Sequence, residues 1–374
     1  MSMKLTIERA ALIRSLNHVQ SVVERRNTIP ILSNVHIDAK DGVLSLMATD
    51  MDIEIVEKVA ADVQTDGATT APAHMLYDIV RKLPEGAQAE LETNSETSQL
   101  VLKSGRSRFT LSTLSTAEFP VMADGDMAHK FSLSGSALRS IIDRTRFAIS
   151  MEETRYYLNG IFLHCTKSDS GDVLRAVATD GHRLARVEIP VPDGALGMPG
   201  VIVPRKTVAE LRRLIDETDE DVAIELSDTK IRFSFDAAIL TSKLIDGTFP
   251  EYDRVIPADN TKLMEVDCKP FAEAVDRVST ISTEKSRAVK LNLDKGNLTL
   301  SANSPDNGTA TEEFEVSYDE DPIEIGFNSR YLLDIMQQID GARVQFALAD
   351  AASPTIVRNL DDNDALYVLM PMRV

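Results

Sequence analysis

The segment Thr179–Leu184 carries the densest set of side chains in the chain that could do chemistry. It reads Thr-Asp-Gly-His-Arg-Leu, so a carboxylate, an imidazole and a guanidinium follow one another around a single glycine. Asp180 and His182 could act together as general acid and base. The alternative is a β-turn, in which Asp and Gly take their usual structural roles.

A second group of candidate side chains is acidic. Asp50, Asp52 and Glu54 alternate along the chain, which places the three carboxylates on one face if the segment is a strand. Carboxylates at this spacing could hold a metal ion. A strand face exposed to solvent is the simpler interpretation.

Other catalytic and cofactor motifs are missing from the sequence. It contains no phosphate-binding P-loop, no dinucleotide fingerprint and no nucleophile elbow. The six histidines are scattered, and Cys165 and Cys268 are too few for a disulfide framework or a four-thiolate zinc site. We therefore expect two small core cysteines, no cofactor and no metal, and a protein that holds a partner rather than converts a substrate.

The elements that must position these residues recur three times along the chain. In each copy, alternating apolar residues change to apolar residues at helical spacing, which predicts a strand followed by a helix. The first such motif occupies 4–16, 130–142 and 263–275, and the second occupies 69–83, 201–215 and 323–339. The tripeptide Ala-Thr-Asp also occurs twice, at 48–50 and 178–180.

This repetition predicts an α+β fold of three tandem domains, each with two helices packed on antiparallel sheets. The helices are expected over 9–19, 73–83, 136–148, 205–216, 269–281 and 330–340. The expected domains are residues 1–125, 126–256 and 257–374, joined by polar linkers near 121–129 and 253–262.

Composition is that of an ordinary globular protein. The chain has 374 residues, of which 43% are hydrophobic and 26% charged. No apolar run approaches the roughly 18 residues of a membrane span. The N-terminus has no apolar leader segment, so we expect a cytoplasmic protein.

The formal net charge of −19 argues at first against a nucleic-acid partner. The six expected helices, however, contain 14 bases and 8 acids, so they carry +6 and the remainder of the chain carries −25. Helices gathered on one side of the sheets would form a positive face on an acidic body. Such a face predicts contact with phosphates without base readout, and Arg14, Arg205 and Lys206 are candidates for that contact.

Several segments carry a resemblance to the bacterial DNA polymerase III β-subunit family, the replicative sliding clamps. They are GRSRFTLSTL (105–114), RYYLNG (155–160), ATDGHRLA (178–185), VIVPRK (201–206), TSKLIDGTFPEYDRV (241–255) and VLMPMR (368–373). The resemblance covers the whole chain. It implies a head-to-tail homodimeric ring in which helices line the hole, sheets form the wall, and duplex DNA passes through without sequence readout.

The resemblance also implies partners and site residues. The partners are DNA polymerase III through its α subunit, other DNA polymerases, repair proteins and a clamp-loader ATPase. The partner-peptide pocket would be lined by Arg155, Tyr157, Leu158, Thr179, Gly181, His182, Arg183, Leu184, Pro250, Arg254, Val255, Asn328, Tyr331, Val368, Met370, Pro371, Met372 and Arg373. The ring joint would use Phe109 and Leu111 against the region of Thr280 and Ile281, and Arg26 would contact DNA.

Within the pocket, leucines, valines and methionines suit an apolar peptide, and His182 and Arg183 are expected to bind polar groups at the rim. Two other classes of function remain open from the residues alone. One is an enzyme that uses Asp180 and His182. The other is a repeat-built scaffold that has no role on DNA.

Overall fold

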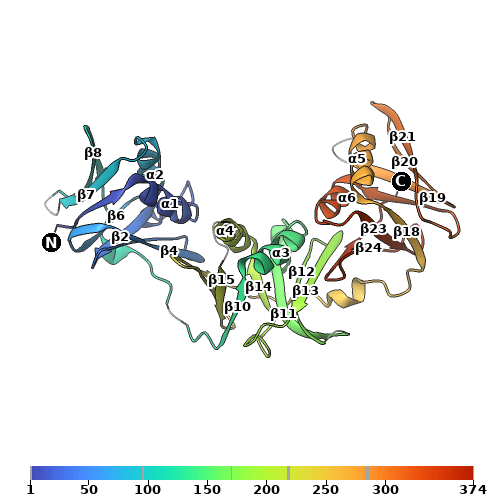
Figure 1. Cartoon of the computed structure of the whole chain (residues 1–374), viewed down its shortest axis with the longest axis horizontal. Helices are drawn as coiled ribbons and strands as arrows, with labels where there is room; N and C mark the ends of the chain where they lie inside the picture. The colour runs from blue at the N-terminus through green and yellow to red at the C-terminus, as the bar shows by residue number, and fades with distance from the viewer. Residues whose placement is uncertain are drawn as a thin grey trace. The chain divides into compact units, whose positions relative to one another are not determined.

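The computed structural model describes residues 2–94, 97–123, 125–169, 171–216, 220–282 and 287–373, and it divides into two compact units (Figure 1). The first unit comprises Met1–Ser136 and Ala209–Leu244, and the second comprises Ala137–Val208 and Ile245–Val374. The expected linker at 121–129 includes Asp124, which lies outside the described residues.

The first unit contains two antiparallel sheets. The five-stranded sheet has the order β5-β1-β7-β8-β9, and the eight-stranded sheet has the order β10-β15-β16-β17-β4-β3-β2-β6. The smaller sheet consists of β1 (Lys4–Glu8), β5 (Asp62–Thr65), β7 (Gln88–Asn94), β8 (Gln99–Ser104) and β9 (Ser107–Ser112). The larger consists of β2 (Asn34–Lys40), β3 (Val43–Thr49), β4 (Ile53–Ala60), β6 (Gly67–Pro72), β10 (His129–Ser134), β15 (Asp221–Leu226), β16 (Lys230–Ser234) and β17 (Ala238–Lys243).

The second unit also contains one large and one small antiparallel sheet. Their orders are β14-β11-β12-β13-β25-β24-β23-β18 and β21-β20-β19-β22. The larger sheet consists of β11 (Gly160–Ser168), β12 (Gly171–Thr179), β13 (Arg183–Pro190), β14 (Val201–Pro204), β18 (Lys262–Asp267), β23 (Arg343–Leu348), β24 (Thr355–Asn359) and β25 (Ala365–Leu369). The smaller consists of β19 (Ala288–Asp294), β20 (Asn297–Ser304), β21 (Gly308–Glu315) and β22 (Ile323–Asn328).

The two eight-stranded sheets have the same architecture, which explains why the compact units do not coincide with the sequence repeats. In each sheet, four strands of one repeat continue into four strands of the next. The junction is the antiparallel pair β4–β17 in the first unit and β13–β25 in the second. Three tandem repeats are therefore joined through continuous hydrogen-bonded sheets.

Among the described residues, the chain forms α-helices in the six places expected. They are α1 (Arg9–Gln20), α2 (Ala73–Lys82), α3 (Gly135–Arg146), α4 (Arg205–Ile215), α5 (Cys268–Ser279) and α6 (Ser329–Met336). Short 3₁₀ turns are η1 (Pro30–Ser33), η2 (Thr116–Glu118), η3 (Glu153–Leu158) and η4 (Tyr252–Val255). In α1, Leu12, Leu16 and Val19 are fully buried at helical spacing, as an amphipathic helix on a sheet requires.

Helix α6 ends four residues earlier than expected. Beyond Met336, the N–H groups of Gln338 and Ile339 donate to carbonyls three residues back, on Ile335 and Met336. The last turn is thus tightened into 3₁₀ geometry. Ile339 is still buried, so its apolar character extended the periodic pattern past the true end of the α-helix.

The expected strand over Asp50–Glu54 is wrong. Asp50 and Asp52 lie in the turn between β3 and β4, where Asp50 Oδ1 accepts the N–H groups of Asp52 (2.9 Å) and Ile53 (2.7 Å). Glu54 is on β4, but it is buried and accepts the N–H of Met122, so it is not on a solvated face either. Asp50 therefore forms an Asx-turn, whereas the Asp52 carboxylate lies 3.0 Å from Nζ of Lys243.

The two expected core cysteines differ. Cys268 is buried, whereas Cys165 is only partly buried and its Sγ lies 3.3 Å from the carbonyl oxygen of Ala195. Across the described residues, no group of three or more His, Cys, Asp or Glu side chains is placed to hold a metal ion. No described helix is long and apolar enough to cross a membrane.

Candidate functional site

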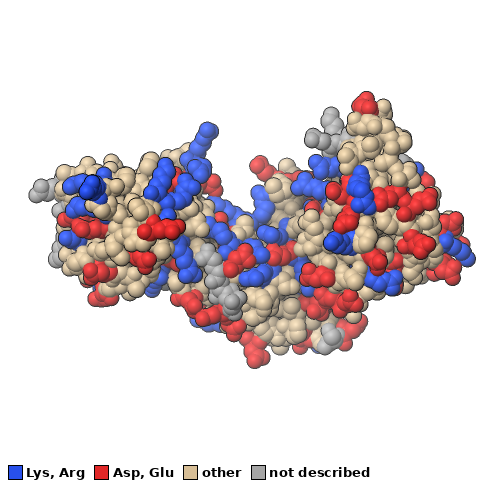
Figure 2. Space-filling view, turned by 45° about the horizontal axis from the view of Figure 1, so that its top comes forward, with Lys and Arg blue, Asp and Glu red and all other residues tan. Residues whose placement is uncertain are grey.

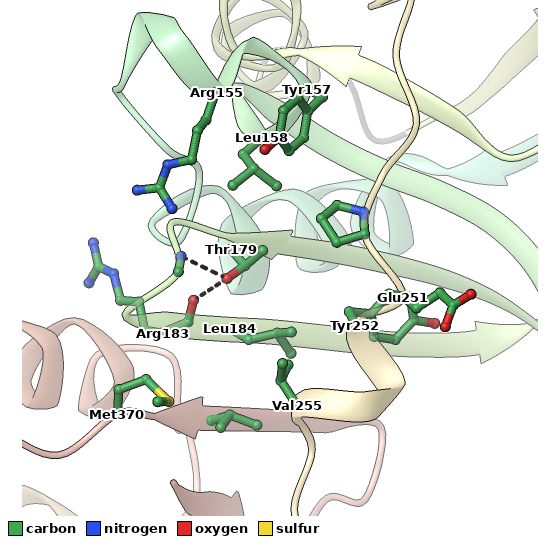
Figure 3. Close-up of a pocket in the computed structure, with 13 residues that line it drawn as sticks. Arg155, Tyr157, Leu158, Thr179, Arg183, Leu184, Glu251, Tyr252, Val255 and Met370 are labelled. Carbon is green, nitrogen blue, oxygen red and sulfur yellow. Dashed lines mark hydrogen bonds between the residues drawn. The ribbon is translucent and has the colours of Figure 1, made fainter.

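A cavity of about 280 Å³ opens in the second unit where β13 pairs with β25 (Figure 3). Its lining comes from η3, from the turn between β12 and β13, from the segment that includes η4, and from the end of β25. The lining residues are Arg155, Tyr157, Leu158, Thr179, Gly181, Arg183, Leu184, Pro250, Glu251, Tyr252, Val255, Val368 and Met370.

The floor of the cavity is set by strand register. Leu184 on β13 lies directly opposite Val368 on β25, and both side chains belong to one buried cluster with Leu158. A shift of one residue would turn both side chains to the other face of the sheet. The antiparallel junction therefore builds an apolar surface from parts of the chain more than 180 residues apart in sequence.

The turn from Thr179 to Arg183 is held by its own side chains. Thr179 Oγ1 donates to the carbonyl of Arg183 (2.7 Å) and accepts the N–H of Gly181 (3.1 Å), as the dashed lines in Figure 3 mark. Asp180 Oδ1 accepts the N–H groups of His182 (2.9 Å) and Arg183 (3.0 Å). The first Ala-Thr-Asp copy shares three of these four bonds: Thr49 Oγ1 accepts the N–H of Met51, and Asp50 Oδ1 accepts those of Asp52 and Ile53.

Gly181 is needed at this turn for two reasons. Its φ of +86° lies in the left-handed region, which strongly favours glycine. A Cβ at this position would also stand 2.7 Å from Nη1 of Arg155. The turn can approach η3 this closely only because it has no side chain there.

Arg183 lines the cavity, but its guanidinium group forms hydrogen bonds with residues that do not line it. It donates to Asp334 of α6 (2.5 Å) and to the carbonyl of Phe147 (2.6 Å), and its Nε lies 3.2 Å from Asp180 Oδ2. It also lies 4.3 Å from the ring centroid of Tyr331. In Figure 3 the group points away from Leu158 and Leu184. Its charge is already neutralised inside the fold by Asp180 and Asp334, and its expected role at the rim stays a prediction.

Arg155 forms a second internal ion pair at the edge of the cavity. Its Nε and Nη2 lie 2.8 and 2.7 Å from the two carboxylate oxygens of Glu152. The hydrogen bond from Arg155 lowers the pKa of Glu152. This edge is polar but electrically balanced, so burial of apolar surface provides the main attraction for a ligand.

Two lining residues, Glu251 and Tyr252, were not predicted from the sequence. They directly follow the expected Pro250. Tyr252 is 5% exposed and packs with Phe249 against the floor cluster. Glu251 pairs with Arg254 at 2.5 Å, and Arg254 itself is largely exposed and does not line the cavity. The aromatic residue type at position 252, two residues after Pro250, is the one sequence feature that could have indicated a buried side chain in the cavity lining.

The remaining expected pocket residues are not on the lining of the cavity. They are His182, Asn328, Tyr331, Pro371, Met372 and Arg373. His182 stacks on Tyr331 with ring centroids 6.3 Å apart, and Asn328 caps α6 by accepting the N–H of Arg330. The N–H of Met372 donates to the carbonyl of Gly326 on β22, which holds the tail next to the pocket.

The geometry does not support acid–base chemistry at Asp180 and His182. One Asp180 oxygen accepts two backbone N–H groups and the other faces the guanidinium of Arg183. The carboxylate therefore acts as a turn-forming group. His182 is turned to the ring of Tyr331.

The expected DNA-contacting bases lie on exposed helix and loop positions. Arg14 is exposed on α1, Arg205 is exposed at the start of α4 next to the half-exposed Lys206, and Arg26 is exposed in the loop after α1. With the observed helix ends, the helices contain 14 bases and 6 acids, so they carry +8. Of these, α1 to α4 contain 11 bases and 3 acids. Figure 2 shows Lys and Arg side chains in several groups on one face, with Asp and Glu side chains beside them.

The residues expected at the ring joint lie on or near edge strands of the two smaller sheets. Phe109 and Leu111 are half-buried on β9, the last strand of the five-stranded sheet. Thr280 is exposed at the C-terminal cap of α5, and Ile281 follows it, half-buried, near the edge strand β21. An edge strand offers unpaired backbone groups to a second chain.

Three α+β domains joined by continuous sheets, with one apolar pocket at a junction, define a binding protein of the sliding-clamp class. Three models of the DNA polymerase III beta subunit match in order: the N-terminal domain at 3–123, the central domain at 132–251 and the C-terminal domain at 253–373. The chain belongs to the DNA polymerase III beta subunit family.

Curated relatives and solved structures agree with that assignment. The Beta sliding clamp of Caulobacter vibrioides is 55% identical and that of Escherichia coli K12 is 39% identical, each over 100% of both chains. A DNA polymerase sliding clamp from Caulobacter crescentus superposes with a TM-score of 0.95 at 54% identity over 100% of both chains. The Bartonella birtlesii sliding clamp bound to griselimycin superposes at 0.97, with 50% identity over 100% of both chains.

Proposed function

We propose that this chain is a DNA sliding clamp: a non-catalytic subunit that encircles duplex DNA and tethers DNA polymerase III and other replication and repair proteins. The observation that carries the proposal is the apolar cavity of about 280 Å³ at the β13–β25 junction, in a chain whose family consists of clamps. A ring holds DNA topologically, so weak contacts with phosphates suffice and the clamp can slide.

The pocket is the proposed docking site for partner peptides. Its floor of Leu158, Leu184 and Val368 is apolar, and Met370 offers an adaptable side chain at its end. We assign the same site to His182, Arg254, Asn328, Tyr331, Pro371, Met372 and Arg373 as a surrounding shell, since they adjoin the lining without forming it. Extended or helical peptides with apolar anchors fit such a groove.

Deletion of residues 370–374 tests the pocket. The deletion removes Met370 from the lining and the Met372–Gly326 hydrogen bond beside it. A fluorescent peptide from the clamp-binding region of the polymerase should lose most of its affinity, while the mass of the protein in solution stays that of the full-length protein. Unchanged peptide affinity in the deletion variant would refute the docking site.

The ring is proposed to close head to tail between two copies. Half-buried Phe109 and Leu111 on edge strand β9 would meet the region of Thr280 and Ile281 in the second copy. Charge supports this pairing: Arg106 and Arg108 flank the apolar positions of β9, and Glu313 and Glu315 lie on edge strand β21.

We further propose domain boundaries at 1–125, 126–256 and 257–374, and a location in the cytoplasm. The boundaries are supported by the extended segments that precede β10 and β18. Because the chain has no nucleotide-binding motif, opening of the ring falls to a clamp-loader ATPase. DNA contact is assigned to Arg14, Arg26, Arg205 and Lys206, whose helices and loop carry the positive charge.

A further inference from the structure

Tyr252 connects the pocket to a set of side chains beneath it that do not line the cavity. It belongs to the wall segment, defined as residues 250–255, from which Pro250, Glu251, Tyr252 and Val255 line the cavity. Its hydroxyl lies 2.9 Å from Nη1 of Arg175 and 2.8 Å from Nε2 of His164. Both partners lie on the sheet below, on β12 and β11.

These partners form a cross-strand row. His164 on β11 is the direct neighbour of Arg175 on β12, and Arg175 is the direct neighbour of Glu188 on β13. Arg175 is 7% exposed, and its Nη2 lies 2.8 Å from Glu188 Oε1. The row therefore supplies a buried guanidinium that pairs with Glu188 on one side and donates toward Tyr252 and Asp253 of the wall segment on the other.

The direction of the hydrogen bonds is determined by chemistry. Arginine has only donors, so the Tyr252 oxygen accepts from Arg175. Burial raises the pKa of Tyr252 and lowers the pKa of His164, so the first keeps its proton and the second is neutral. With the His164 ring proton on Nδ1, Nε2 accepts the tyrosine proton. Every polar atom of the Tyr252 side chain is satisfied in this arrangement.

Besides Tyr252, the wall segment has one further side-chain contact with the row: Arg175 Nη1 also lies 3.4 Å from Asp253 Oδ1. Helix η4 is a single 3₁₀ turn of 4 residues, and its N-terminal residue Glu251 makes no side-chain cap. Arg254 and Val255 are exposed. The second anchor is Phe249, whose ring stacks on Phe162 of β11 at 4.8 Å and 7°. The inner face of the segment thus depends on Phe249 and Tyr252.

We propose that the row His164–Arg175–Glu188 positions the wall segment for partner binding, by holding Tyr252 so that Val255 and Pro250 face the cavity. The inference rests on the proposed function of the pocket as a peptide site. In this view the three row residues are positioning residues: none contacts the peptide, and each acts through Tyr252.

The test measures affinity for the labelled polymerase peptide in two single variants. Tyr252→Phe keeps the ring and its packing but loses the hydroxyl, and Arg175→Met loses the donor. Each should weaken binding by about tenfold, the cost of losing a hydrogen bond to a charged group. Arg343→Met is the control, since it breaks a more exposed ion pair with Glu265 on the same sheet away from the pocket, and it should bind as the unaltered protein does.

A mutant cycle separates positioning from general stability. Val255→Ala should weaken binding in the unaltered protein but have little further effect in Tyr252→Phe, because the wall is already displaced. Additive effects of the two changes, or full affinity in Tyr252→Phe, would overturn the inference. If Leu158→Ala loses binding while Tyr252→Phe does not, the proposal of a peptide site in the pocket still stands and only the role of the row is contradicted. Failure of the unaltered protein to bind any clamp-binding peptide would instead contradict the proposed function.

Discussion

Gly181 controls how closely the turn after β12 approaches Arg155. Alanine there would adopt an unfavourable positive φ, at a cost of about 1–2 kcal/mol, and would push against Nη1 of Arg155. We expect Gly181→Ala to fold with lowered stability, displace the Arg155–Glu152 pair and weaken peptide binding.

Gly86→Ala is the matched control for this change. Gly86 has a similar φ of +70°, but a Cβ there would meet no atom within 4 Å. Denaturant titration should show a similar loss of stability in both variants, and only Gly181→Ala should lose peptide affinity. Equal affinities would mean that the close approach to Arg155 does not shape the pocket.

His164 makes stability depend on pH. Burial lowers its pKa below the ordinary value of 6.5, so the unfolded chain binds a proton at this residue more readily than the folded chain does. The stabilising contribution is therefore present above about pH 6.5 and is lost as the pH falls through the folded pKa.

Thermal unfolding between pH 7 and pH 5 measures this effect. The melting temperature should fall toward pH 5, and His164→Gln should show a smaller fall. His36, whose pKa burial also lowers, supplies a residual slope. A His164→Gln profile parallel to that of the unaltered protein would contradict the assignment.

At the scale of single residues, the sequence indicated which residues line the pocket better than it indicated which partners their polar groups bind. The expectation from the resemblance included Leu158, Leu184 and Val368, which line the cavity. It also placed Arg183 at the rim, but no local pattern shows that Asp334, far along the chain, pairs with this guanidinium. Tyr252 was missed because its partners Arg175 and His164 come together only through strand pairing.

At the scale of elements, the periodic patterns predicted the helices well and the connections poorly. The starts of α1, α2 and α4 match the expected positions because apolar spacing changes there from two to 3.6 residues. The turn at Asp50 was predicted as a strand because Asp50, Asp52 and Glu54 are spaced two residues apart, as residues on one face of a strand are. The continuous eight-stranded sheets could not be predicted, since the sequence of a strand does not show which other strand it pairs with.

Helix α1 depends on α4 for its C-terminal end within the first unit. Arg213 donates to the carbonyls of Asn17 and His18, each at 2.8 Å, and also pairs with Glu210. A cation at a helix C-terminus satisfies terminal carbonyls and interacts favourably with the helix dipole.

Arg213→Met should lower the free energy of unfolding by about 1–2 kcal/mol, because those carbonyls lose charged donors. Lys82→Met, at an exposed position on the end of α2, is the control and should change stability by less than about 0.5 kcal/mol. Denaturant titration of both variants compares them. Equal stabilities would show that the cap contributes nothing.

At the scale of the whole molecule, the charge is segregated more sharply than the sequence indicated. Asp216 and Asp340 fall outside the observed helices, which raises their charge from +6 to +8. All of this excess lies on α1 to α4, because α5 and α6 together carry as many acids as bases. We therefore expect the first four helices to provide most of the attraction for DNA.

Self-association is predicted to depend on edge strand β9. Leu111→Asp places a charge on its half-buried face, which should reduce the mass in solution from twice 41.1 kDa to 41.1 kDa. Thr110→Asp, on the opposite, exposed face of the strand, is the control and should remain dimeric. Light scattering measures both masses, and a dimeric Leu111→Asp protein would exclude β9 from the joint.

The central claim is that the protein holds DNA by encircling it, and one retention measurement tests it most directly. The protein is loaded with clamp loader and ATP onto nicked circular DNA, the circle is then cut once, and the bound protein is counted before and after the cut. The account predicts stable retention on the circle and rapid loss from the linear ends. Equal retention on both forms would contradict it, because contact alone, rather than topology, would then hold the protein on DNA.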